Sequence, residues 1–379
     1  MTDKVLIIDG NSPSGLSAVR SLKKHGLKVG VLSTRAYSYA SHSKYVYENF
    51  GYANPLESLN TFQRKILKII DKGYSLLFYF SDDSALALFS MQDKLPDEIK
   101  KSFPPKGAIK IAFDKLKTVR LCKKLNIPAP KTYTKIKDIS INSFPLVAKS
   151  RGLFNQDFKF SKKNKITFIN SMEEFKKNIK PKNLLIFQEY IPGKEYGSFF
   201  LVNHGKIRAS FAHQRILSFK PYGGASIFRK SIKFPKEMWK YSTKILKKLK
   251  WHGIAMIEFK KDERDSKYKL IEINGRFWGS LPLAISAGID FPYLYYKMCK
   301  EGDVKVKTDY RINIYQKNII GMISSIPSYI FDKVPNIENR CILDLAYGLI
   351  KLSRDDVFSL KDPMPFVNGI KYLIRRILN

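Results

Sequence analysis

A predicted β-hairpin near residue 265 constrains the fold more than any other feature of the sequence. Its two apolar strands are separated by a polar connection, in the order 254–259, 260–267 and 268–273. Residues two apart on a strand point to one face of a sheet, so Glu272 and Asn274 share a face. With the turn centred near Asp265, antiparallel pairing places Glu258 opposite Glu272. The hairpin therefore predicts two carboxylates and an amide oxygen on one face.

These oxygen atoms indicate a cation site. Two neighbouring acids repel each other in a low-dielectric cleft unless a cation lies between them. Mg²⁺ prefers hard oxygen ligands and usually also binds substrate phosphates and water. Arg276 follows Asn274 by two positions on the same side, where it can neutralise charge on a phosphoryl group. The alternative is that Glu258 and Glu272 are exposed on a half-solvated sheet.

The segments before the hairpin predict partners for a nucleotide. Lys149 ends an apolar strand, which would place its ammonium at the rim of a cleft. Residues 188–191 form an extended strand that can offer backbone N–H and C=O groups to an adenine edge. The strand runs into a turn that contains Glu195, whose carboxylate can accept both ribose hydroxyls. Alternatively, Glu195 is a surface acid paired with Lys194 or Lys206.

The remaining pattern predicts an α/β protein in several parts. Val5–Ile8 is a short apolar strand, a turn and a helix over 16–25 follow it, and a second βα unit comes next. Residues 1–112 are therefore expected to form an open parallel α/β domain. Gly10-x4-Gly15 differs from the GxGxxG turn that binds dinucleotides, although a helix N-terminus can still bind an anion. The expected boundaries of the other parts are 113–190, 191–304 and 305–379.

Charge and cysteine usage bear on partners and compartment. The chain has 68 Lys and Arg against 33 Asp and Glu, a net charge of +35. The cations are spread along the chain and no nucleic-acid motif accompanies them, which favours solvated surfaces over specific nucleic-acid binding. An anionic membrane or another polyanion is the alternative. Three scattered cysteines, and the absence of a signal peptide or a bilayer-spanning apolar run, favour a cytoplasmic protein.

Six ordered blocks resemble the ATP-grasp superfamily over roughly residues 1–300. The blocks are the N-terminal α/β domain, Asp114-Lys115, Val147-Ala148-Lys149, Gln188-Glu189-Tyr190-Ile191 with Glu195, Ile257-Glu258-Phe259, and Ile271-Glu272-Ile273-Asn274-Gly275-Arg276. The stretch from Arg215 to Ser226 and residues 361–365 are similar to a carbamoyl-phosphate-synthase-like branch of carboxylate–amine ligases, whose members are often suspected of modifying cell-surface glycans.

The resemblance implies a fold, ligands and a reaction. The fold would be ATP-grasp, with the N-terminal α/β domain, an α+β ATP-binding part made of a lid and a larger subdomain, and a helical C-terminal extension. The ligands would be ATP and Mg²⁺ or Mn²⁺. A substrate carboxylate would become an acyl phosphate and then couple to an amine, with release of ADP and phosphate. Both substrates would be small molecules or glycan-linked groups.

The resemblance also implies a role for each matching residue. ATP would contact Lys115, Lys149, Glu189, Tyr190, Ile191 and Glu195, in order from phosphates to adenine to ribose. The metal would be held by Glu258, Glu272 and Asn274. Phosphoryl transfer would be assisted by Arg276 and Lys149.

One loop departs from the family pattern. The lid loop after Lys149 is usually Gly-rich, but residues 150–156 contain a single glycine. Either Arg151 replaces the backbone amides with a charged side chain, or the loop closes poorly. Poor closure would make the chain a nucleotide-binding or regulatory module with weak activity.

The acceptor substrate is expected near residues 223–226, where two glycines permit close backbone approach. An arginine would bind its carboxylate in a bidentate fork. The candidate residues are Arg215, Gly224, Ser226 and Arg229. The alternatives are surface arginines and, for His213, a structural histidine. Asp82 and Asp83 either reach this pocket or cap the next helix.

The C-terminal segment 364–379 predicts a basic amphipathic helix. It either docks on the rest of the protein, as most terminal helices do, or lies on an anionic membrane at the inner membrane surface. A homodimer is a further candidate assembly.

Overall fold

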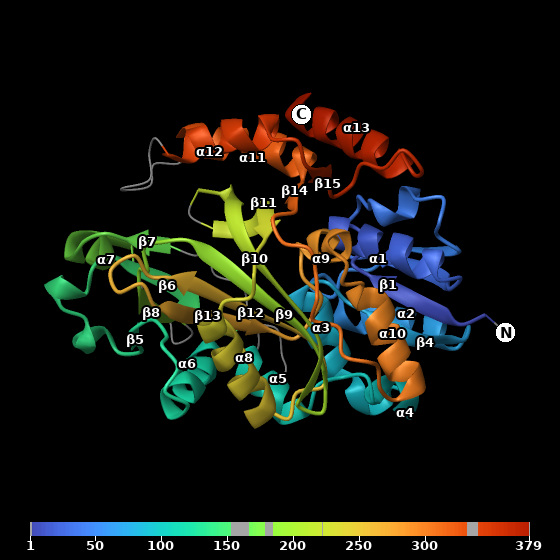
Figure 1. Cartoon of the computed structure of the whole chain (residues 1–379), viewed down its shortest axis with the longest axis horizontal. Coiled ribbons are helices and arrows are strands. Elements are labelled where there is room, and N and C mark those ends of the chain that lie inside the picture. Colours follow the sequence, from blue (N-terminus) through green and yellow to red (C-terminus); the bar gives the residue numbers. More distant parts are fainter. Residues whose placement is uncertain (1, 153–166, 179–184, 222, 332–339, 379) are drawn as a thin grey trace.

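The computed structural model describes residues 2–152, 167–178, 185–221, 223–331 and 340–378 (Figure 1). Three sheets and the helices around them make up this part of the chain, so the predicted α/β class is confirmed. The segments 153–166 and 179–184 lie outside the described residues, and they include most of the loop that departs from the family pattern.

The N-terminal part is an open sheet of four parallel strands in the order β3-β2-β1-β4. The strands are β1 (Lys4–Ile8), β2 (Lys28–Ser33), β3 (Glu48–Tyr52) and β4 (Tyr74–Phe78). The helices are α1 (Pro13–Lys24), α2 (Leu59–Ile70), α3 (Asp82–Ser90), α4 (Asp97–Lys100) and α5 (Lys106–Ala112). Short 3-10 turns lie at Ala40–His42 and Gln92–Lys94. The apolar run Val5–Ile8 is fully buried, as expected for a central parallel strand.

The spacing of Gly10 and Gly15 serves close packing between β1 and α1. A Cβ at Gly10 would lie 2.3 Å from a methyl of Val31, and one at Gly15 would lie 2.9 Å from the Asp9 carbonyl oxygen. Ser12 begins α1 as its N-cap, and its Oγ accepts a hydrogen bond from the Gly15 N–H at 2.9 Å. Both glycines are therefore explained without a bound dinucleotide.

Asp9 ties together the loops at the carboxyl ends of three strands. Its buried carboxylate accepts hydrogen bonds from the N–H groups of Phe80 and Ser81, both at 2.9 Å. It also accepts hydrogen bonds from the hydroxyls of Thr34 at 2.6 Å and Ser84 at 2.8 Å. The carboxylate thereby fixes the loop that opens α3, which carries Asp82 toward the hairpin.

The substitution Asp9→Asn should lower the free energy of unfolding by about 2–4 kcal/mol, because an amide NH₂ would face donors where an oxygen now accepts. Asparagine tolerates the positive φ of 67° found at this position, so the backbone is not the cause of the loss. Urea denaturation measures the change. Asp93→Asn, an exposed acid with one lysine partner, is the control and should change stability by less than about 0.5 kcal/mol. Equal losses in the two variants would contradict this role for Asp9.

A small antiparallel sheet in the order β5-β8-β6-β7 forms the second part. Its strands are β5 (Thr132–Tyr133), β6 (Leu146–Ser150), β7 (Thr167–Ile169) and β8 (Leu185–Glu189). Its helices are α6 (Lys115–Lys124) and α7 (Met172–Asn178), with 3-10 turns at Ile136–Asp138 and Ile141–Ser143. The sheet has its own apolar core, centred on Leu146, Ile169 and Phe187.

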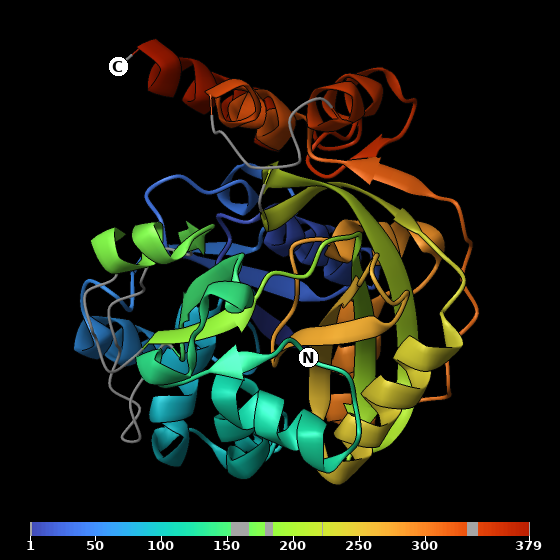
Figure 2. The ribbon, with the colours of Figure 1, turned by 90° about the vertical axis from the view of Figure 1, so that its left-hand side faces the viewer.

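The largest sheet has the strand order β13-β12-β9-β10-β11-β14-β15. Its strands are β9 (Glu195–Asn203), β10 (Lys206–Lys220), β11 (Gly223–Ser231), β12 (Gly253–Lys261), β13 (Tyr268–Asn274), β14 (Tyr315–Lys317) and β15 (Arg354–Asp355). The accompanying helices are α8 (Lys236–Lys248), α9 (Leu281–Ala287) and α10 (Phe291–Glu301). Figure 2 shows the small sheet beside the hairpin strands of this sheet.

The C-terminal extension completes the large sheet and then covers it. Strands β14 and β15 add to the β11 edge, and three helices follow the same segment of chain. These helices are α11 (Ile319–Phe331), α12 (Arg340–Ile350) and α13 (Met364–Leu378). They form one layer along the side of the molecule that carries β11 and β15 (Figure 1). None of the helices in the described ranges has the length and apolar character needed to cross a bilayer.

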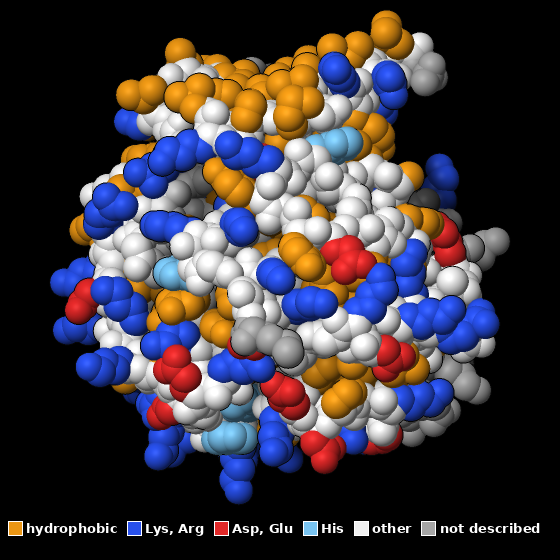
Figure 3. All heavy atoms as spheres, turned by 90° about the vertical axis from the view of Figure 1, so that its right-hand side faces the viewer, with side chains coloured by type: hydrophobic (Ala, Val, Ile, Leu, Met, Phe, Trp, Pro, Cys, Tyr) orange, Lys and Arg blue, Asp and Glu red, His pale blue; other side chains and the backbone are white. Residues whose placement is uncertain are grey.

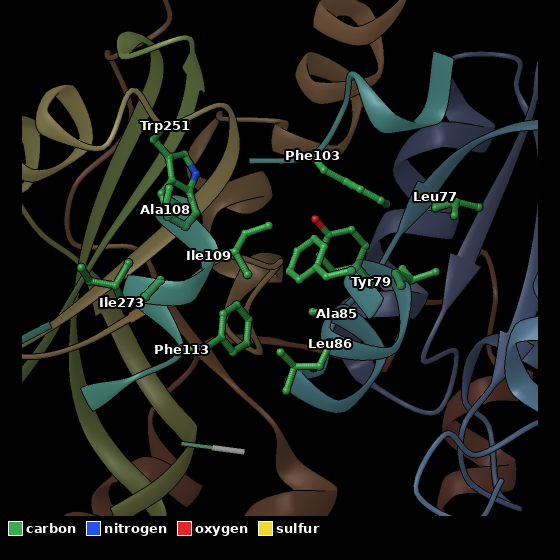
Figure 4. Close-up of a cluster of buried hydrophobic side chains, with 14 of the residues drawn as sticks. Leu77, Tyr79, Ala85, Leu86, Phe103, Ala108, Ile109, Phe113, Trp251 and Ile273 are labelled. Atoms are coloured by element: carbon green, nitrogen blue, oxygen red, sulfur yellow. The ribbon is translucent and has the colours of Figure 1, made fainter. Parts of the chain in front are cut away.

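Alternation along β12 anchors the hairpin on both faces. Ala255, Ile257 and Phe259 join an apolar cluster that also contains Trp251 and Phe113, and this cluster reaches Leu77 and Tyr79 of the N-terminal part (Figure 4). On the opposite face, Ile254 and Met256 pack in a second cluster with Trp278. Glu258 follows on that second face, where the apolar packing ends. The polar residues of the hairpin therefore begin where the apolar packing of β12 ends.

Candidate active site

The predicted pairing of Glu258 with Glu272 is present. In the antiparallel register of β12 and β13, Ile257 pairs with Ile273, Glu258 with Glu272 and Met256 with Asn274. A bulge follows immediately, because Phe259 pairs with Leu270 and leaves one extra residue in β13. The acids therefore lie side by side on the face opposite Ile273, which is buried in the core.

The two carboxylates have pKa values shifted in opposite directions. Burial raises the pKa of Glu258, the Arg215 guanidinium lowers it, and the neighbouring Glu272 raises it again, with a net upward shift. Burial also acts to raise the pKa of Glu272, but Lys115 and the Asn274 amide outweigh it and hold that pKa well below its usual range. Lys115 Nζ lies 3.6 Å from Glu272 Oε2, and Asn274 Nδ2 donates to Glu272 Oε1 at 3.1 Å.

This donor set fits a divalent cation that shares its coordination with other oxygen ligands. The described residues contain no group of three or more His, Cys, Asp or Glu that could hold a metal alone. Two adjacent carboxylates and one amide oxygen supply a partial shell, which is typical of Mg²⁺ bound together with phosphates and water. Burial, and to a smaller extent the adjacent Glu272, raises the pKa of Glu258, and a cation bound between the two acids would oppose both effects.

Metal binding at this pair should therefore depend on pH. Burial raises the pKa of Glu258 to about 7, so below that pH the cation must displace a proton. The apparent affinity for Mn²⁺ alone, measured by electron paramagnetic resonance, should stay constant above pH 8 and fall by up to about tenfold between pH 7 and pH 6. Binding that is equally strong at pH 6 and pH 8 would contradict a site built on Glu258.

Lysines from the small sheet face the same carboxylates. Lys149 ends the apolar run of β6, and burial lowers its pKa to about 8, with Lys115 and Lys260 acting in the same direction and Glu272 acting against them. Lys115 is the first residue of α6, which Asp114 caps through the N–H groups of Leu116 and Lys117. The site therefore lies between the two antiparallel sheets, with acids from one and amines from both.

The strand expected to meet adenine leads from the small sheet to the large one. The Tyr190 N–H donates to Pro145 O at 3.0 Å, and Lys260 Nζ lies 4.9 Å from the centre of the Tyr190 ring. Ile191 is buried, and within the described part of the chain no acceptor is found for its N–H. The Glu189 side chain points elsewhere, since it accepts from Lys131 N at 2.9 Å and from Arg264 at 3.1 Å. Its carboxylate fixes the strand, and the Glu189 and Tyr190 N–H groups donate to Lys131 O and Pro145 O, so the Ile191 N–H is the backbone donor of this segment that stays available.

Glu195 lies in the site with cations around it. Arg215 Nη1 donates to its carboxylate at 2.7 Å, Ser218 donates at 3.4 Å, and Lys260 lies 3.9 Å away. Burial opposes ionisation of Glu195, but Arg215 and Lys260 outweigh it and lower the pKa. The surface pairs with Lys194 or Lys206 are not formed. Arg215 also reaches Glu258 at 3.4 Å, so one guanidinium links the expected ribose and metal residues.

Arg276 is held by a residue from the N-terminal part. Its Nε donates to Asp82 Oδ1 at 2.6 Å, and its Nη2 donates to Asn274 Oδ1 at 3.4 Å. Ser81, and not Asp82, caps α3 by accepting from the Ser84 N–H. Asp82 therefore does not cap α3, and it orients the arginine beside the paired acids.

The four expected acceptor residues divide between two environments. Arg215 is in the ion cluster just described, and its Nη1 donates to the Gly224 carbonyl at 3.1 Å. Arg229 is fully buried and is ion-paired with Asp356 of the extension. Ser226 lines a cavity of about 270 Å³ between the N-terminal part, β11 and the extension. No local pattern in the sequence indicates Asp356 or this cavity.

His213 is buried next to the acids, and neither of its ring nitrogens has a hydrogen-bond partner among the described residues. It pairs across the sheet with Gly197, which itself pairs with Glu258. A Cβ at Gly197 would lie 2.7 Å from His213 Nε2, so only glycine lets the imidazole lie flat there. Burial and the nearby arginines keep the pKa of His213 well below its usual range, so the ring is neutral.

Arg151 is also engaged. Its guanidinium forms a bidentate pair with Asp114, with distances of 2.9–3.1 Å. The guanidinium thus fastens the start of the loop to the N-terminus of α6. Residues 153–156 of this loop lie outside the described residues.

A protein-family model described as ATP-grasp in the biosynthetic pathway with Ter operon matches residues 181–318. No curated protein matches the chain. Among solved structures, the biotin carboxylase domain of 2-oxoglutarate carboxylase from Hydrogenobacter thermophilus, determined with MgADP, ADP and bicarbonate, has a TM-score of 0.64 at 16% identity and covers 83% of this chain and 73% of that one.

Two other similar structures are ligases or synthetases by name. L-amino acid ligase from Bacillus licheniformis has a TM-score of 0.59 at 15% identity and covers 79% of this chain and 74% of that one. N5-carboxyaminoimidazole ribonucleotide synthetase from Thermotoga maritima has a TM-score of 0.59 at 18% identity and covers 83% and 80%. The family model covers the β12–β13 hairpin, and the chain shares its fold with these three solved structures.

Proposed function

We propose that the protein is an ATP-dependent ligase that uses Mg²⁺ or Mn²⁺ to couple a carboxylate to an amine. The observation that carries this proposal is the Glu258–Glu272 pair on the large sheet, with the half-buried Lys149 of the small sheet near it. Two adjacent acids with lysines close to them match the needs of a metal-bound triphosphate. The similar ligase structures support the same reaction class.

Each residue of the site would have a role in the reaction that follows from its position. Bound Mg-ATP would supply the phosphoryl group, and the carboxylate oxygen of the acid would form the new P–O bond as the bond to ADP breaks. Lys149 and Arg276 would offset the charge that develops on the phosphoryl oxygens. Asp82 would keep the Arg276 guanidinium in place during transfer. The amine would then form the C–N bond as phosphate leaves.

The acceptor would bind beside β10 and β11. Several buried polar atoms there have no partner among the described residues, which is unusual in a folded protein. They are His213 Nδ1 and Nε2, Arg215 Nε, Ser226 Oγ, Arg229 Nε and Gln316 Oε1. A ligand with both donors and acceptors would satisfy them. The adjoining cavity of about 270 Å³ has room for a small group such as an amino acid or part of a sugar.

The test measures phosphate release from ATP in the presence of pooled amino acids, carboxylic acids and amino sugars, followed by mass spectrometry of the products. A product mass equal to the acid plus the amine minus water supports the proposal. A regulatory module with weak activity is the second candidate, because Arg215 and Lys260 already occupy the Glu195 carboxylate. Tight Mg-ATP binding without phosphate release from any pool would favour that module and exclude the ligase.

A further inference from the structure

The C-terminal layer of α11, α12 and α13 carries most of the exposed apolar side chains of the molecule. Fifteen of the twenty-two exposed large apolar residues found among the described residues lie between 323 and 378. Figure 3 shows hydrophobic side chains gathered over this layer, with Lys and Arg at their edge. Soluble monomers rarely expose an apolar patch of this kind without a partner.

The layer is firmly attached through its inner face. Asp362 accepts hydrogen bonds from Arg20 at 2.9 Å and from Ser43 at 2.8 Å. Tyr372 of α13 stacks on Tyr37 with ring centres 4.5 Å apart. The outer apolar residues therefore lie on the solvent side of helices that are docked on the rest of the protein.

The outer face has helical periodicity of its own. On α13, exposed Met364, Val367, Ile374 and Leu378 recur at three- or four-residue steps, interrupted by Lys371. The most exposed apolar residues lie in the adjoining connection, where Leu352 is 95% exposed and Leu360 is 86% exposed. An apolar stripe on the solvent side of a docked helix is typical of insertion into a bilayer interface.

The positive charge exposed on this layer favours an anionic partner. Every exposed charged residue in the described range 340–378 is positive, namely Arg354, Lys361, Lys371, Arg375 and Arg376. The four acids of the same range are half-buried or buried, and Asp356 and Asp362 point inward. A second copy would bring these cations against an identical set on a chain of net charge +35. An anionic lipid surface complements both the charge and the apolar groups.

We propose that the outer face of α11, α12, α13 and the 351–363 connection docks on the surface of an anionic phospholipid bilayer. The apolar side chains enter the interface and the five cations contact lipid phosphates. The protein is held on the surface without crossing it. The attachment can be tested apart from the ligase reaction, since Leu352 and Leu360 neither belong to the Glu258–Glu272 site nor line the cavity proposed for the acceptor.

Co-sedimentation of the full chain with lipid vesicles tests the proposal. The wild type should bind vesicles of phosphatidylcholine mixed with phosphatidylglycerol at least about tenfold more tightly than pure phosphatidylcholine. The double variant L352S/L360S should lose about tenfold or more in affinity for the mixed vesicles, because two exposed apolar anchors are removed. The matched control L56S/I141S removes exposed apolar residues elsewhere and should bind like the wild type.

Thermal unfolding of all three proteins checks that the side chains, which point to solvent, leave the fold intact. Equal vesicle binding by wild type and L352S/L360S would overturn the proposal. Failure of the wild type to bind anionic vesicles would do the same. A stable wild-type dimer in light scattering that L352S/L360S dissociates would assign the face to a second copy and also overturn it.

Discussion

Replacement of Glu272 by glutamine is expected to reduce ATP-dependent product formation by at least about 10³-fold while the protein stays folded. The amide keeps the shape of the side chain but removes the charge that pairs with Lys115 and that would bind the proposed cation. Glu258 would then lose its acidic neighbour, so its pKa should fall. The remaining site keeps one carboxylate and the Asn274 amide, which is too few charged ligands to hold a metal–triphosphate in a fixed position.

Phosphate release and Mn²⁺ binding measured on the same preparations distinguish loss of the metal from loss of the fold. Glu237→Gln, an exposed acid on α8, removes the same charge away from the site and should keep full activity. The thermal midpoint of both variants should stay within a few degrees of the wild type. Activity of Glu272→Gln within tenfold of the wild type would remove the hairpin from the proposed mechanism.

Replacement of Arg229 by methionine is expected to lower the free energy of unfolding by about 3–5 kcal/mol at neutral pH, because it leaves Asp356 buried and unpaired. Both partners are almost fully buried, with side-chain exposures of 0% and 2%. Burial already raises the pKa of Asp356 to about 6, although Arg229 acts to lower it. Without the arginine, that pKa should rise further.

The pH dependence of this loss has a definite sign. An acid whose pKa is higher in the folded than in the unfolded state contributes stability that is present at low pH and is lost as pH rises through the folded value. The Arg229→Met variant should therefore recover part of its stability between pH 7 and pH 5. The double variant R229M/D356L should be more stable than Arg229→Met alone, because the unpaired charge is gone.

Arg208→Met is the matched control, because Arg208 pairs with Asp303 at a position where the acid is 49% exposed. Its loss should be no more than about 1 kcal/mol. Urea denaturation of the four proteins at two pH values gives all of these differences. A similar cost for Arg208→Met and Arg229→Met would show that burial of the pair does not govern its contribution.

Local pattern was enough to predict the parts of the site that lie on one hairpin. Alternation of apolar and polar residues fixed which faces of β12 and β13 meet the core, and turn position fixed the pairing of Glu258 with Glu272. The bulge after Glu258 was not predictable, since it depends on how many residues the β12–β13 connection uses. The side chains that support the site were also missed, because their partners are far apart in sequence.

The large sequence separation between these partners explains why their contacts were not predicted. Arg276 and Asp82 are 194 residues apart, and Arg229 and Asp356 are 127 residues apart. No periodicity or spacing rule connects such pairs in a single sequence. Glu189 was assigned correctly to the strand that precedes the turn, but its side-chain contacts with Lys131 and Arg264 depend on how the small sheet meets the hairpin. These contacts depend on tertiary packing, which local sequence propensity does not predict.

The place of β14 and β15 at the edge of the large sheet has a consequence for synthesis of the protein. During translation, β9–β13 leave the ribosome well before the strands that cover the β11 edge. A nascent chain would therefore expose an unpaired β11 edge until β14 is made, and Arg229 would lack its acid until Asp356 is made. Chaperone contact or aggregation should therefore begin at the nascent β11 edge. A chain terminated before β14 should aggregate, because its β11 edge would stay unpaired.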